Sequence, residues 1–118
     1  MAWLTQRIAS FGHAFRGLRA MLVEEPHARI HLLATVVVLG LGWLLQISRG
    51  DWQVLMLTVA LVWMAEGLNT ALEHLADAAV PEHHPLVGKA KDVAAGSVLL
   101  TAGFAVVMAG LIFLPYLL

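Results

Sequence analysis

Apolar residues gather in three long runs that short polar segments separate. The runs cover residues 30–47, 52–72 and 93–118. A helix rises about 1.5 Å per residue, so each run is roughly long enough to cross the ~30 Å hydrocarbon core of a bilayer. The pattern therefore predicts three transmembrane helices.

Two polar connections join these runs. Residues 48–51 form a short break typical of a tight turn between antiparallel helices. The segment from about residue 78 to residue 91 is polar and contains Pro81 and Pro85. We expect it to be a loop outside the membrane.

The first 28 residues lack a spanning run but carry a single apolar stripe. His13, Arg16 and Arg19 fall on the other side of a helix built on this stripe. We expect residues 1–28 to form an amphipathic helix in the membrane interface, with its basic face toward phosphate headgroups. The stripe recurs at intervals of three and four residues, at Leu4, Ile8, Phe11, Phe15, Leu18 and Leu22.

The composition is that of an integral membrane protein. Of the 118 residues, 60% are hydrophobic and 13% are charged, and the mean hydropathy is +0.82. Residues 1–118 are therefore expected to form one all-α membrane domain. A net charge of −1 provides no basic excess for nucleic acid, and the absence of cysteine excludes thiolate chemistry.

The basic residues lie mainly before the first and third runs. Only Arg49 lies between the first and second runs. Cytoplasmic segments of membrane proteins are enriched in lysine and arginine, so we expect the amino terminus and the second connection to be cytoplasmic. The residues that carry this bias are Arg7, Arg16, Arg19, Arg29, Lys89 and Lys91.

Polar residues at the end of the second run are the strongest functional signal. Glu66, Asn69, Glu73 and Asp77 recur at intervals of three and four and share one helix face. A carboxylate near the bilayer centre costs about 2.5–3.5 kcal/mol on insertion scales, so acids there need water, a cation or a partner. With the expected orientation, Glu25 reaches the same cytoplasmic depth.

Carboxylates and lysines on one cytoplasmic face suit a phosphoryl-transfer site. Mg²⁺ prefers one or two carboxylates together with substrate phosphate oxygens. Such catalysis also needs a base for the attacking hydroxyl, and Glu66 could fill that role. The sequence contains no GxxxxGK[ST] or GxGxxG motif, so a nucleotide must be held in another way.

Two other classes of protein would also contain apolar spans. A proton-coupled transporter would use buried acids as a relay, but would need them through the full membrane depth. A non-enzymatic membrane subunit would explain the spans, but not the acidic face. Phosphorylation of a hydroxyl fits the pattern better.

Two motifs give the chain a family resemblance. Residues 66–77 match E-x-x-N-x-x-x-E-x-x-x-D, and residues 90–92 read A-K-D. With the Phe15-Arg-Gly-Leu and Glu25-Pro-His-Ala-Arg29 stretches, they resemble the small bacterial integral-membrane diacylglycerol kinases and undecaprenol kinases. The resemblance implies an ATP- and Mg²⁺-dependent homotrimer with shared active sites in the bacterial cytoplasmic membrane.

The resemblance also implies roles for the acidic face. Glu66 looks like the catalytic base that contacts the lipid substrate, and Asn69 would orient the reacting groups. Glu25 and Glu73 look like the Mg²⁺ ligands. Asp77 is similar to an acid that supports the site.

The resemblance also implies that further residues bind the lipid or the nucleotide. Arg29 lies where the lipid or phosphate is approached. The residues implied in nucleotide binding are Lys91, Asp92, Glu82, His83, His84, His13 and Arg7.

The implied substrate depends on the branch of the family. Positions 13 and 31 carry histidine where the proteobacterial diacylglycerol kinases carry tyrosine and glutamate. The Arg29-Ile-His31, His84-Pro-Leu and Phe113-Leu-Pro115 segments look more like the undecaprenol kinase branch. Undecaprenol is therefore the expected lipid. Diacylglycerol, which would give phosphatidic acid, is the alternative.

Overall fold

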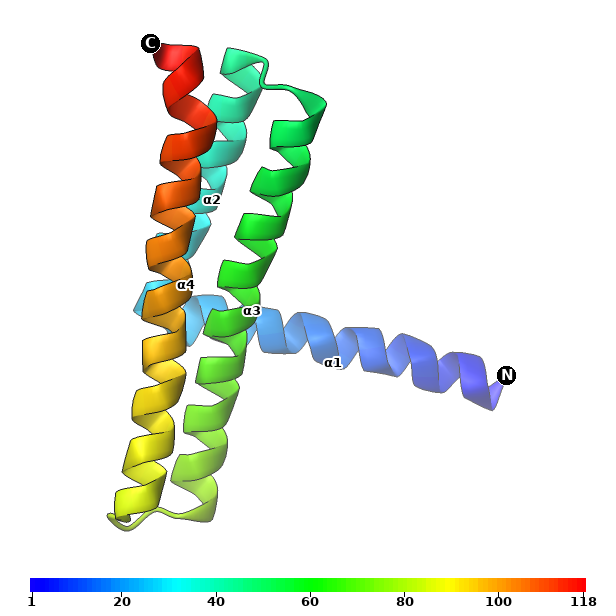
Figure 1. Ribbon diagram of the computed structural model, residues 1–118. Coiled ribbons are helices and arrows are strands. Elements are labelled where there is room, and N and C mark those ends of the chain that lie inside the picture. The colour runs from blue at the N-terminus through cyan, green and yellow to red at the C-terminus, as the bar shows by residue number, and fades with distance from the viewer.

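The computed structural model describes all 118 residues, which form four helices. Helices α2, α3 and α4 are each long and apolar enough to cross a membrane, as the sequence predicts. They lie side by side, whereas α1 projects sideways from the bundle (Figure 1). The helices are α1 (Ala2–Glu24), α2 (Pro26–Leu45), α3 (Arg49–Ala79) and α4 (Pro85–Leu117).

The turn between α2 and α3 begins and ends earlier than residues 48–51. Gln46 closes α2 in the left-handed conformation, with φ 51° and ψ 52°. Ser48 caps α3, because its hydroxyl accepts a hydrogen bond of 3.1 Å from the backbone N–H of Asp51. Residues 49–51 therefore belong to α3 and not to the turn.

The predicted loop over residues 78–91 is also shorter in the structure. Helix α3 continues to Ala79, and α4 already begins at Pro85. Nδ1 of His84 accepts a hydrogen bond of 3.1 Å from the backbone N–H of Leu86. Proline at the first helical position adds to this cap, because its missing N–H would have no helical partner there. Lys89 and Lys91 consequently lie on a helix.

Helix α1 meets the bundle partway along α3. Residues from Ala14 to Met21 of α1 and from Gly67 to His74 of α3 line one groove. Beyond this crossing, α3 and α4 continue as a two-helix hairpin without α2 (Figure 1). The part of α3 from Arg49 to Gly67 is about 27 Å long, close to the thickness of a hydrocarbon core.

The core of the bundle lies near the turn between α2 and α3. Ile47, Leu55, Ile112 and Phe113 form its buried cluster. A Cβ atom on Gly42 would lie 2.9 Å from the ring of Trp52, so this close approach requires glycine. The hydrophobic stripe of α1 and most of the apolar surface of α4 stay exposed in the single chain, which is typical of surfaces that meet lipid or protein partners.

Candidate active site

Glu66 is the buried acid of the bundle. The residue is 3% exposed, and its Oε2 atom lies 3.3 Å from Nε2 of His31 on α2. A charged group removed from water is expensive unless it has a partner. The contact with His31 supplies that partner across the interface between α2 and α3.

A short chain of polar contacts holds His31. Its ring meets Trp63 edge-on, with 6.5 Å between the ring centroids and an angle of 64°. The indole N–H of Trp63 donates to the hydroxyl of Thr35 over 2.9 Å. That hydroxyl donates in turn to the backbone carbonyl of His31 over 2.7 Å. Through Trp63, these contacts connect α2 and α3 beside the His31 ring.

Sequence reasoning did not assign His31 to the site. The available signal was the spacing of His31 and Thr35, which place two polar side chains one helical turn apart inside an apolar run. This spacing indicates a polar face on α2. It does not indicate which residue of α3 that face meets.

A cavity of about 270 Å³ lies next to His31 between α2, α3 and α4. Its wall is mostly apolar and contains small residues such as Ala34, Ala102 and Ala105. His31 and Thr35 contribute polar groups to the wall. The cavity therefore combines an apolar interior with polar groups on its wall, and one of these, His31, contacts Glu66.

One turn beyond Glu66, two polar atoms are buried without a partner. They are Oδ1 of Asn69 and Oγ1 of Thr70. An unsatisfied buried polar group costs about 1–3 kcal/mol, so such groups are uncommon and call for an explanation. Both lie three or four residues from Glu66, on the same helix face.

The junction of α1 and α2 brings further acids to α3. Nε2 of His74 lies 3.7 Å from Oε2 of Glu24 and 4.0 Å from Oε1 of Glu25. Glu73 precedes His74 on α3 and is half-buried. No group of three or more histidine, aspartate or glutamate side chains is arranged to hold a metal ion. The assignment of Glu25 and Glu73 as Mg²⁺ ligands stays a prediction.

Lys91 on α4 forms an ion pair with Asp77 on α3. Lys91 precedes the apolar run that begins at residue 93. Its hydrogen bond to the Asp77 carboxylate raises the pKa of the Lys91 ammonium above its usual value. Lys91 is therefore cationic at physiological pH, whereas the neighbouring Asp92 is exposed without an ion-pair partner.

Arg29 connects α2 to the end of α1. Its guanidinium donates to the backbone carbonyls of Leu22 and Val23, over 3.2 and 3.0 Å. These are among the last carbonyls of α1, which have no partner within the helix. Arg29 thus helps to set the angle between the two helices. Its role in substrate approach stays a prediction.

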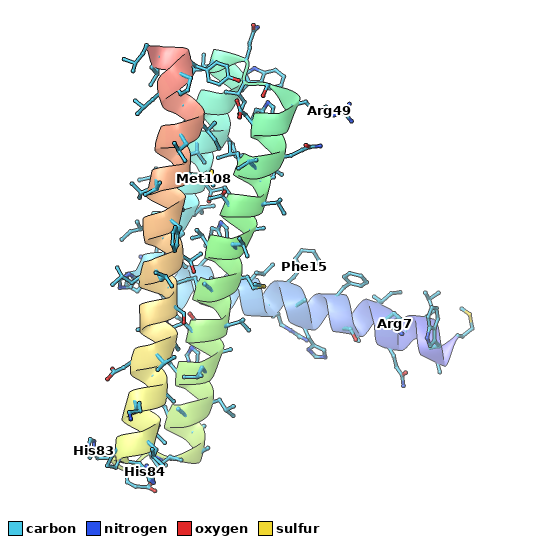
Figure 2. All side chains as sticks on the ribbon, in the orientation of Figure 1. Arg7, Phe15, Arg49, His83, His84 and Met108 are labelled. Carbon is cyan, nitrogen blue, oxygen red and sulfur yellow. The ribbon has the colours of Figure 1, made fainter.

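The other predicted nucleotide-binding residues lie far apart in the single chain. Arg7 is out on the projecting α1, whereas His83 and His84 are at the far end of the α3–α4 hairpin (Figure 2). The Arg7 guanidinium lies 5.3 Å from the centre of the Trp3 ring. His13 contacts Arg16 within α1. Glu82 lies in the short connection beside His83.

Comparison with known proteins decides the family. The profile described as prokaryotic diacylglycerol kinase matches residues 12–113. The chain belongs to the prokaryotic diacylglycerol kinase family. It is therefore a lipid kinase, as its motifs suggest, and membership of this kinase family implies the use of ATP.

Individual relatives of this lipid kinase carry two different names. An undecaprenol kinase of Bacillus subtilis is 38% identical over 114 residues, which cover 97% of this chain and 93% of the relative. A diacylglycerol kinase of Synechocystis is 40% identical over 94% of this chain and 64% of the relative. A diacylglycerol kinase of Escherichia coli is 31% identical over 87% of this chain and 84% of the relative. Family membership alone thus leaves two lipid substrates open.

Proposed function

We propose that this lipid kinase transfers the γ-phosphate of ATP to the hydroxyl group of undecaprenol, with Glu66 as the general base. The observation that carries the proposal is the burial of Glu66 in contact with His31, which lines a mostly apolar cavity. A reactive hydroxyl on a hydrocarbon chain needs both environments close together. Little water reaches a carboxylate in a mostly apolar bundle. Water therefore competes little with the lipid hydroxyl as a proton donor to Glu66.

In the reaction, the lipid hydroxyl oxygen attacks the γ-phosphorus of ATP. A new bond forms between that oxygen and phosphorus, and the bond from phosphorus to the oxygen of ADP breaks. The hydroxyl proton passes to the Glu66 carboxylate. A positioned base of this kind contributes about 10² to 10⁴ in rate.

Asn69 is proposed to orient the reacting groups. Its Oδ1 atom is buried and has no partner within the chain. A lipid hydroxyl or a neighbouring subunit that donates to this oxygen would satisfy it. The i, i+3 spacing keeps Asn69 on the same helix face as Glu66.

Mg²⁺ is proposed to be held by Glu25 and Glu73 together with the nucleotide phosphates. The donor set fits, because Mg²⁺ accepts hard carboxylate oxygens and takes its remaining ligands from substrate and water. Glu24 and Glu25 at this junction contact His74 of α3, the residue that follows Glu73. When bound, the ion would neutralise negative charge on the transferred phosphoryl group.

The nucleotide is proposed to bind to the cytoplasmic hairpin of α3 and α4. Lys91 would contact a phosphate, Asp92 the sugar or base side, and Asp77 would hold Lys91 in place. Glu82, His83 and His84 lie at the tip of this hairpin.

A homotrimer with shared sites is proposed to complete nucleotide binding. Helix α1, which contains Arg7 and His13, projects away from the hairpin of its own chain (Figure 1). These two residues could then reach the nucleotide held by another copy. The exposed apolar surface of the single chain is available for such contacts.

The protein is proposed to lie in the bacterial cytoplasmic membrane, with α1 setting its depth. If α1 lies in the cytoplasmic interface, its exposed apolar stripe meets lipid, and residues 49–67 of α3 cross the hydrocarbon. Arg29, which lies on α2 and contacts the end of α1, then lies at headgroup depth, where it could meet an approaching lipid. The amino terminus and the α3–α4 connection are cytoplasmic in this arrangement.

Undecaprenol is favoured over diacylglycerol by similarity. The match to the Bacillus subtilis undecaprenol kinase covers nearly the full length of both chains.

The test is transfer of labelled γ-phosphate by the purified protein in mixed micelles that contain either undecaprenol or diacylglycerol. We expect the wild-type protein to phosphorylate undecaprenol and the Glu66→Gln variant to form no such product. Faster turnover of diacylglycerol would reverse the substrate assignment.

A further inference from the structure

The contact between His31 and Glu66 carries an inference about how the base is held. We propose that His31 is a positioning residue: its Nε2–H donates to Oε2 of Glu66 and leaves Oε1 free to accept the proton of the lipid hydroxyl. This inference rests on the proposed role of Glu66 as the base. It concerns the geometry of the carboxylate and not the transfer of the phosphoryl group itself.

The first support is the isolation of this pair. The side chains of His31 and Glu66 are 16% and 4% exposed, and Nε2 of His31 lies 3.3 Å from Oε2 of Glu66. No other histidine, lysine or arginine lies within ion-pair distance of Glu66. The orientation of the carboxylate within the chain therefore depends on one partner, and that partner lies on another helix.

The second support is the constraint on the His31 ring. Trp63 packs edge-on against the ring, and the Trp63–Thr35 hydrogen bond holds α2 and α3 in register beside it. A ring restrained in this way presents Nε2 to Glu66 with little freedom to turn away. Catalytic groups lose activity steeply when they are misplaced, by about 10²-fold for a shift of 1 Å.

The third support is the position of His31 on the cavity wall. One side of the imidazole thus faces the space proposed for the lipid chain, while Nε2 faces the base. When the base takes up the hydroxyl proton on Oε1, its Oε2 atom still accepts from His31. The same hydrogen bond can therefore hold Glu66 before and after proton transfer.

The test compares four single variants in the micelle assay with undecaprenol. His31→Leu removes the donor, and we expect kcat to fall by about 10²-fold with an unchanged KM for ATP. His31→Gln keeps an N–H donor at similar reach and should recover most of kcat, whereas the shorter His31→Asn should not. His27→Leu is the matched control, because His27 is exposed one turn earlier on α2, and its kcat should equal that of the wild type.

A double variant separates positioning from a merely structural role. If His31 acts through Glu66, then His31→Leu should cause no further loss of kcat in a Glu66→Gln background. Losses that multiply would overturn the inference, as would normal kcat in His31→Leu. Equal kcat in His31→Gln and His31→Asn would also overturn it, even if the leucine variant fails to fold. By contrast, wild-type turnover in Glu66→Gln alone would overturn the proposed base and hence the proposed function.

Discussion

The hydroxyl of Tyr116 donates a hydrogen bond of 2.6 Å to Oδ2 of Asp51 and so joins the end of α4 to the start of α3. The Tyr116 hydroxyl oxygen also accepts a hydrogen bond of 2.8 Å from the backbone N–H of Ser48. Both contacts lie at the end of the bundle away from the α3–α4 connection. The chain therefore closes its bundle at one end and carries the acidic and basic groups of the proposed site elsewhere.

This closure predicts a variant that loses stability but not activity. Tyr116→Phe keeps the ring and removes both hydrogen bonds, each worth about 0.5–1.5 kcal/mol net. We expect a lower unfolding midpoint in micelles and an unchanged kcat below that midpoint. Combining Tyr116→Phe with Asp51→Asn should give less than the sum of the two losses. Additive losses would show that the two residues do not stabilise the bundle together.

Replacement of Glu66 tests the proposed base. Glu66→Gln keeps the size of the side chain but cannot accept a proton, so kcat should fall by about 10² to 10⁴. The KM for ATP should stay close to the wild-type value, because the nucleotide is proposed to bind on the hairpin. Glu24→Gln is the control, since Glu24 is an exposed acid at the end of α1 with no assigned catalytic role. Near-normal turnover in Glu66→Gln would refute the base assignment.

The helices of this protein could be predicted because their apolar runs are long, but their ends could not be read from hydropathy. Residues 49–51 look like a polar turn, yet the Ser48 cap draws them into α3. Lys89 and Lys91 look like loop residues, yet Pro85 and the His84 cap start α4 before them. Individual hydrogen bonds at a few side chains decide these boundaries.

The candidate site, like the helices, could be predicted from the sequence only in part. The periodicity of α3 places Glu66, Asn69, Glu73 and Asp77 on one face without any knowledge of packing. The partner of Glu66 depends instead on how α2 rotates against α3, and a single sequence does not specify that rotation. His31 was missed for this reason.

The proposed Mg²⁺ ligands predict a change in metal dependence. Glu73→Ala or Glu25→Ala should raise the Mg²⁺ concentration that gives half-maximal activity, because a carboxylate that binds the ion is lost. Glu24→Ala is the matched control at the neighbouring position. A Mg²⁺ titration of each variant at saturating ATP measures the effect. An unchanged titration curve for Glu73→Ala would remove Glu73 from the ligand set.

The ion pair of Lys91 and Asp77 predicts an effect on nucleotide affinity. Lys91→Met keeps the length of the side chain and removes the charge, so the KM for ATP should rise about tenfold or more, as for the loss of a charge-assisted hydrogen bond. Asp77→Asn should raise this KM less, because Lys91 itself remains. Lys89→Met provides an exposed lysine on the same helix as the control. Equal KM values for Lys91→Met and Lys89→Met would argue against phosphate binding by Lys91.

Sites shared between copies predict that two defective chains can restore each other. We expect Arg7→Ala and Lys91→Met each to lower activity, since each removes a proposed nucleotide contact. Helix α1 carries Arg7 away from the hairpin of its own chain (Figure 2), so an oligomer that mixes the two variants would contain sites with both residues intact. Coexpression should then give more activity than either variant alone. If one chain supplied both residues, every site would keep one defect and mixing would restore nothing.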